Sequence, residues 1–61
     1  MAQIIQSNAA DGEWHVYSPS YVGAVLLIGH LYRAMPHNRL WPVVHFSEIG
    51  LAADYCMQTQ A

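Results

Sequence analysis

Residues 21–41 read YVGAVLLIGHLYRAMPHNRLW, and the way this stretch folds decides the architecture of the whole chain. It opens with a run from Val22 to Gly29 that contains no polar residue. His30 and Arg33 interrupt the run well before the roughly 20 apolar residues that a membrane-spanning helix needs. The stretch therefore predicts a buried element of a globular protein and not a membrane span.

The residues that flank this run predict a helix. In SPSY, residues 18–21, either Ser18 or Ser20 can cap a helix, and Pro19 suits the first helical position. Pro36 cannot continue a helix, because it lacks the backbone N–H and its ring clashes with the preceding turn. We therefore expect one helix that runs from this cap to about Met35.

The segments on either side predict three short strands and a second helix. Two strands, over residues 2–7 and 13–18, flank the turn dipeptide Asp11-Gly12 and suggest a hairpin. A third strand is expected over residues 40–47, where Pro42 favours a sheet edge or a bulge. Ser47 is a plausible cap for a helix over residues 48–58.

Together these elements predict an α+β fold of the order ββαβα over residues 1–61, which form a single domain. The second and third strands flank the first helix in a right-handed crossover. Both helices cover one face of a three-stranded sheet, which makes a two-layer domain. Three short strands are barely enough for independent stability, so a partner that completes the fold is expected.

Charged residues are unusually few. They make up 10% of the chain, against about 25% in ordinary globular proteins, and there is no lysine. The formal net charge is −2 with four neutral histidines, so the chain passes through neutrality near pH 6, where we expect its solubility to be lowest. Two arginines are too few for ordinary phosphate binding, which argues against DNA or RNA as a partner. A surface covered by protein explains the composition better.

The sequence contains only weak signals for a metal site, a cofactor or catalytic residues. The potential metal ligands do not form a C-x-x-C or H-x-x-x-H pair that would pre-organise two of them; they are His15, His30, His37, His45 and Cys56. We therefore expect no metal site, no cofactor and no catalytic residue. Cys56 is the only cysteine, and the N-terminal MAQIIQSN has no basic signal region, so a reducing, cytoplasmic setting is expected.

The aromatic residues are the most informative set. Trp14, Tyr17, Tyr21, Tyr32 and Trp41 cannot all lie beneath one small sheet. Either both tryptophans are core residues with the tyrosines at its rim, or some of the set are interface anchors together with arginine. For the second case the expected partner-binding residues are Tyr17, Leu26, Arg33, Arg39 and Trp41.

The expected first helix is apolar all round, which implies that it is buried all round. One stripe, which includes Val25, Ile28 and Tyr32, would face the sheet. Val22, Leu26 and Leu27 would then lie on the opposite side and form an interface, in the simplest case a symmetric homodimer.

The predicted function is therefore a small non-enzymatic protein–protein interaction module. Small domains without motifs that are encoded by phages and other mobile elements often inhibit or modulate larger complexes, for example in anti-defence. This expectation rests on analogy with that class of proteins. A structural subunit of a larger assembly is the alternative. A small metal- or nucleic-acid-binding module is a further alternative.

Overall fold

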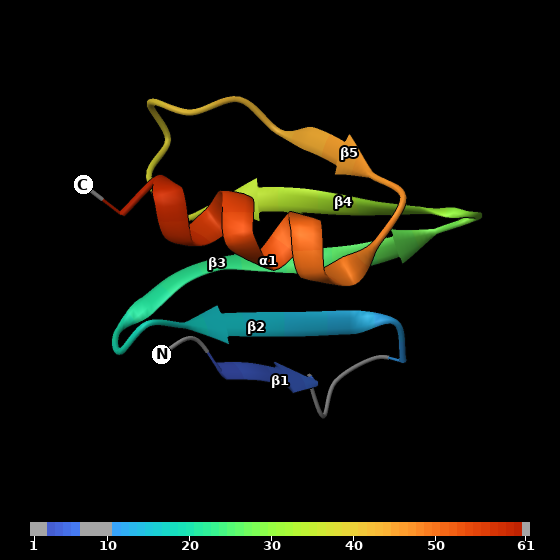
Figure 1. The fold of residues 1–61 in the computed structure, drawn as a ribbon, viewed down its shortest axis with the longest axis horizontal. Coiled ribbons are helices and arrows are strands. Elements are labelled where there is room, and N and C mark those ends of the chain that lie inside the picture. Colours follow the sequence, from blue (N-terminus) through green and yellow to red (C-terminus); the bar gives the residue numbers. More distant parts are fainter. Residues whose placement is uncertain (1–2, 7–10, 61) are drawn as a thin grey trace.

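The computed structural model describes residues 3–6 and 11–60, which form one antiparallel sheet and one helix. The strands follow the chain order β1-β2-β3-β4-β5, and each pairs with the next. Helix α1 lies across one face of the sheet, over its middle strands (Figure 1). The elements are β1 (Gln3–Gln6), β2 (Glu13–Tyr17), β3 (Tyr21–Ile28), β4 (Leu31–Pro36), β5 (Val44–Phe46) and α1 (Ile49–Gln58).

The α+β class is confirmed, but the predicted ββαβα arrangement of three strands and two helices is wrong. The expected helix from residue 18 or 20 to Met35 is instead the hairpin β3–β4. Ile28 pairs with Leu31, which leaves Gly29 and His30 as a two-residue loop. Gly29 has φ 63° and His30 has a negative φ, the pattern of a type II′ turn with glycine first.

The hairpin is hidden in the sequence because both of its faces are apolar. Val25 lies on the face that α1 covers, and its neighbour Leu26 lies on the other face, where it pairs with Arg33. A strand with one wet face alternates apolar and polar residues, whereas one that is apolar on both faces reads as a continuous run. The predicted right-handed crossover is therefore also wrong, since adjacent antiparallel strands need only a short turn.

The other predicted elements are present in the structure, with changed bounds. The two N-terminal strands exist and pair antiparallel, with Gln6 opposite Trp14; residues 7–10 of their connection lie outside the described residues. The strand expected over residues 40–47 is reduced to the three residues of β5. The second helix is confirmed as α1, although its N-cap is Glu48 rather than Ser47 and makes no side-chain capping bond.

Residues 18–20, predicted to start a helix, are the turn between β2 and β3, and the Ser18–Pro19 peptide is cis. Directly after it the pairing shifts by one residue: Tyr17 is opposite Tyr21, while Val16 is opposite Gly23. Val22 is the extra residue of this β-bulge. Bulged strands bend, and here Val22 joins the buried cluster beside Gly23.

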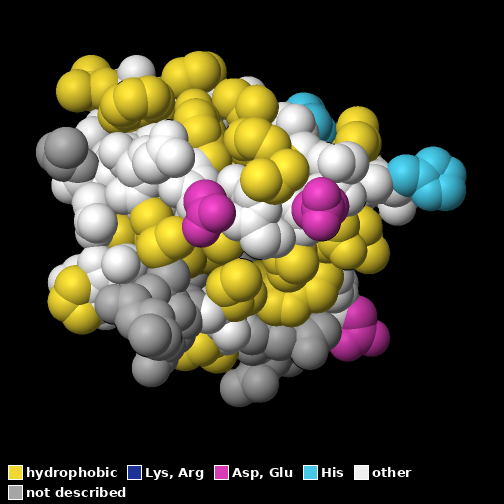
Figure 2. Space-filling model, viewed as in Figure 1, with side chains coloured by type: hydrophobic (Ala, Val, Ile, Leu, Met, Phe, Trp, Pro, Cys, Tyr) yellow, Lys and Arg dark blue, Asp and Glu magenta, His cyan; other side chains and the backbone are white. Residues whose placement is uncertain are grey.

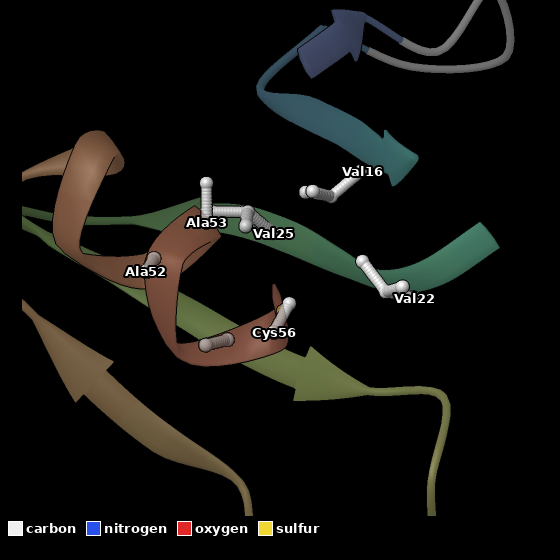
Figure 3. Close-up of a cluster of buried hydrophobic side chains, with 7 residues drawn as sticks. Val16, Val22, Val25, Ala52, Ala53 and Cys56 are labelled. Atoms are coloured by element: carbon white, nitrogen blue, oxygen red, sulfur yellow. The ribbon is translucent and has the colours of Figure 1, made fainter. Parts of the chain in front are cut away.

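The core lies between the sheet and α1. Figure 3 shows Val16 from β2 and Val25 from β3 converging on Ala52, Ala53 and Cys56 of the helix. The helix residues are small, so the helix backbone approaches the sheet closely. Gly23 lies opposite Cys56, and a Cβ at this position would come within 2.8 Å of the Cys56 Sγ.

Candidate protein-binding surfaces

The face of the sheet opposite α1 is covered by no described helix or strand. We call it the open sheet face and define it by the residues whose alternation places them there. They are Ile5, Glu13, His15, Tyr17, Tyr21, Ala24, Leu26, Ile28, Leu31, Arg33, Met35 and His45. Most are apolar or aromatic, although an open antiparallel face is ordinarily polar. Leu31, at the tip of the β3–β4 hairpin, is 44% exposed.

The charged residues of the open sheet face lie in one row across the strands. Glu13 of β2 is opposite Leu26 of β3, Leu26 is opposite Arg33 of β4, and Arg33 is opposite His45 of β5. The Arg33 Nε donates a hydrogen bond to the His45 Nε2 at 3.1 Å. The Glu13 carboxylate lies 3.7 Å from the His15 Nε2. The row is therefore acidic on one side of Leu26 and basic on the other.

Tyr21 is the centre of an aromatic group at the far end of the same face. Its ring centroid lies 5.6 Å from those of His15 and Tyr17 and 5.2 Å from that of His37, each in an edge-to-face arrangement. Burial raises the pKa of the Tyr21 phenol, with smaller contributions from Cys56, Tyr17 and Glu13. Tyr17 and Tyr21, for which a half-exposed rim was one of the two alternatives, are half-buried and pack on each other on this face.

A second surface is the loop between β4 and β5, residues 37–43, which we call the β4–β5 loop. The Asn38 Nδ2 donates to the backbone carbonyl of Thr59 at 3.1 Å, and its Oδ1 accepts the Leu40 N–H at 3.0 Å. The Tyr55 hydroxyl donates to the carbonyl of Pro42 at 2.7 Å. These bonds fasten the loop to α1 and to the residue that caps its C-terminus.

The β4–β5 loop displays apolar side chains. Leu40 is 91% exposed, the highest value among the exposed large hydrophobic residues, and Trp41 and Val43 are also exposed. The Trp41 ring meets the Tyr55 ring edge to face, with their centroids 6.1 Å apart. Trp41 is therefore not a core residue, and Trp14 packs only partly buried against the core cluster. Figure 2 shows the side that carries α1, where apolar side chains predominate and no arginine is in view.

The predicted partner-binding residues divide between these two surfaces. Tyr17, Leu26 and Arg33 lie on the open sheet face, whereas Arg39 and Trp41 lie in the β4–β5 loop. Sequence reasoning missed Leu40 and Asn38. The asparagine two residues before Leu40 was a usable signal, because asparagine side chains often bond the backbone two residues on.

The predicted interface of Val22, Leu26 and Leu27 does not form one patch. It rested on a helical wheel, and these residues lie in a strand. Val22 is buried in the core, and Leu27 lies on the same face of β3 as Val25, opposite Tyr32. Of the three, Leu26 alone lies on the open sheet face, whereas Leu27 is 44% exposed on the other face of the sheet.

A cavity of about 300 Å³ lies where the β2–β3 turn meets the C-terminus of α1. Its walls come from three places in the chain: residues 18–22, His37 with Asn38, and Thr59 with Gln60.

Within residues 3–6 and 11–60, no three His, Cys, Asp or Glu side chains are grouped closely enough to hold a metal ion. The helix of the described chain is not long and apolar enough to cross a membrane.

Comparisons with known proteins identify no relative. No protein-family model matches the chain, and no curated protein and no solved structure is similar to it.

Proposed function

We propose that the protein is a non-enzymatic protein-binding module that modulates a larger protein or complex, and that the β4–β5 loop is the surface it presents to its target. The observation that carries this proposal is Leu40. A leucine that is 91% exposed stands on a loop that hydrogen bonds fasten at both ends. A large apolar side chain left in water forgoes about 1.5–3 kcal/mol of burial, which binding would recover.

The anchoring of the loop supports this assignment. Binding is weakened when a flexible segment must be ordered first, so a loop already held in place loses less on association. Asn38 bonds both to Thr59 and to the Leu40 N–H, so it ties the exposed leucine to the helix. Arg39 and Trp41 flank Leu40, and arginine and tryptophan are enriched among residues that dominate binding energies.

Composition supports the same reading. Interface cores are depleted of lysine, and this chain contains none. Cys56 is a buried free thiol, which fits a reducing compartment such as the cytoplasm.

The test is capture of a target by tagged protein from an extract of its own cells. Leu40→Ser should abolish capture, because it removes the proposed anchor. Leu51→Ser is the matched control, since Leu51 is also exposed, at 47%, but lies on α1. If both variants capture the target as well as the wild type does, the loop is not the binding surface.

The same experiment separates a modulator from a structural subunit. A modulator should be recovered with one enzyme or complex and in less than equimolar amount. A subunit should be recovered in fixed stoichiometry with its neighbours in an assembly. Recovery of no protein at all by the wild type would contradict the proposed function in both forms.

A further inference from the structure

The open sheet face carries a charge pattern that is complementary to itself. In its central row, Leu26 has Glu13 on one side and Arg33 on the other, each one strand away. Neighbouring strands are about 4.8 Å apart, so the two charges lie at equal and opposite offsets from β3. From this symmetry we propose that the open sheet face packs against the same face of a second copy of this chain, about a two-fold axis that runs along β3.

The direction of the axis follows from the charges. A two-fold axis along β3 turns the second sheet over and exchanges its two sides. Glu13 of each copy then faces Arg33 of the other, and Leu26 faces Leu26. An axis across the strands through the same row would instead place glutamate against glutamate and arginine against arginine. Only the axis along β3 gives two ion pairs of opposite charge.

Arg33 needs such a counter-charge. Its Nε donates a hydrogen bond to the Nε2 of His45, which accepts as a neutral ring. Among the described residues, none forms an ion pair with the Arg33 guanidinium. Among the described residues, the one ion-pair contact of the Glu13 carboxylate is with His15, at 3.7 Å, and it is an ion pair only when the histidine is protonated. Both charged side chains are partly buried among apolar neighbours. A carboxylate from a second copy would pair with the guanidinium while the apolar residues around it are covered.

The rest of the face suits this arrangement. The row next to the central one holds Ile5, His15, Ala24 and Met35, and its residue on β3, Ala24, is small and buried. Ile5, Ile28 and Leu31 are exposed on this face. Two sheets packed face to face run within about 30° of each other, which a two-fold axis along the strands allows.

The size of the face is adequate. The molecule measures 29 × 22 × 18 Å, and the view down its shortest axis looks onto the plane of the sheet (Figure 1). A standard interface buries about 800 Å² on each partner. The outline of the molecule in this view, 29 × 22 Å, gives an area of that order once the relief of the side chains is included. Both faces of the sheet would then be covered, one by α1 and one by the second copy.

The inference is independent of the proposed function, because the β4–β5 loop and the open sheet face are separate surfaces. Leu40→Ser should abolish target capture and leave the dimer intact. A wild type that is monomeric but captures a target through Leu40 would contradict this inference alone. A wild type that dimerises but captures no target would contradict the proposed function alone.

The experiment is sedimentation equilibrium of the full chain over a wide concentration range. The wild type should be a dimer. Glu13→Arg and Arg33→Glu should each raise the dimer Kd by about tenfold or more, because each reverses two pairs at once. An equimolar mixture of the two variants should associate as tightly as the wild type, since each arginine then meets a glutamate. The double variant E13R/R33E should also dimerise like the wild type.

Circular dichroism must first show that the variants fold. If a reversal does not, Glu13→Gln and Arg33→Gln replace it, and each should raise the dimer Kd by a smaller factor. A wild type that is monomeric throughout overturns the inference. A dimer that no charge substitution weakens also overturns it, because that dimer would use another surface or the axis across the strands.

Discussion

Arg33 and His45 are joined across β4 and β5 by a hydrogen bond in which the Arg33 Nε is the donor and the His45 Nε2 the acceptor, at 3.1 Å. A ring nitrogen that accepts carries no proton, so neutral His45 must hold its proton on Nδ1. The bond fixes the edge strand β5, which has only three residues, to its neighbour through side chains as well as backbone.

The tautomer of His45 is the first prediction. Long-range ¹H–¹⁵N NMR spectra at neutral pH should show His45 as the Nδ1–H form. Arg33→Ala removes the donor and should abolish this preference. A His45 that is mainly Nε2–H in the wild type would contradict the bond.

Gly23 and Gly50 predict opposite effects of the same substitution. A Cβ on Gly23 would lie 2.8 Å from the Cys56 Sγ and 2.8 Å from the Met35 carbonyl oxygen, so Gly23→Ala must displace both α1 and the neighbouring strand β4. We expect a loss of about 2–3 kcal/mol in the free energy of unfolding, in the range for overpacked cores.

Gly50→Ala is the control, since Gly50 lies in α1 and nothing is within 4 Å of its Cβ position. It should stabilise the protein by about 0.5–1 kcal/mol, the helix preference of alanine over glycine. Urea unfolding measures both values. Equal effects of the two substitutions would contradict the close contact between the helix and β3.

Cys56 predicts a loss of stability at alkaline pH. Burial raises the pKa of its thiol, so the folded protein favours the neutral form. The unfolded chain releases this proton from about pH 8.5, the ordinary thiol pKa. The free energy of unfolding should therefore be constant below that pH and fall as pH rises through the folded pKa.

Urea unfolding in the presence of reductant, from about pH 7 to pH 10, measures this loss. Cys56→Ala should have a flatter profile, and any remaining decline near the top of the range is assigned to Tyr21, whose phenol pKa is also raised by burial. Parallel profiles for the wild type and Cys56→Ala would mean that the thiol does not contribute.

The hydrogen bonds of Asn38 should hold the β4–β5 loop in place. Asn38→Ala removes the bonds to the Thr59 carbonyl and the Leu40 N–H, and should cost about 1–2 kcal/mol of stability. Asn38→Asp keeps the acceptor for Leu40 but loses the donor to Thr59. Hydrogen exchange of the Leu40 amide should thus be fastest in Asn38→Ala and intermediate in Asn38→Asp. Unchanged exchange in Asn38→Ala would show that the loop is held by other contacts.

The elements that could be predicted from the sequence are those whose residue pattern fits a single type of secondary structure. The final helix has small residues on a single face, and the strands around Asp11-Gly12 are short β-rich runs beside a turn. Prediction from the sequence failed at residues 21–36, where Val25 packs under α1 and Leu26 lies open on the other side. With both sides apolar there is no alternation, and helix and hairpin cannot be told apart by period. Gly29-His30 at the midpoint was the remaining clue to the hairpin.

The candidate surfaces were predictable in kind but not in position. The scarcity of charge and the apolar run over residues 22–29 are enough to indicate a second apolar face. The pairing of Glu13 and Arg33 across Leu26 depends on strand register, which the sequence does not display. Asn38 signals a turn before Leu40, but the bond from Asn38 to the Thr59 carbonyl, 21 residues away, cannot be read from the sequence.

We propose that the apolar residues exposed in a single chain are covered by other protein chains when the protein works. Hydroxyl-radical footprinting measures this directly, by comparing leucine oxidation in dilute purified protein and inside the cells that produce it. In the isolated chain Leu31 is 44% exposed, Leu51 is 47% exposed and Leu40 is 91% exposed. The oxidation of each leucine in the dilute sample is therefore the reference for its oxidation in cells. We predict that Leu31 and Leu40 are protected in cells relative to Leu51. Equal labelling ratios in the two samples would contradict the account.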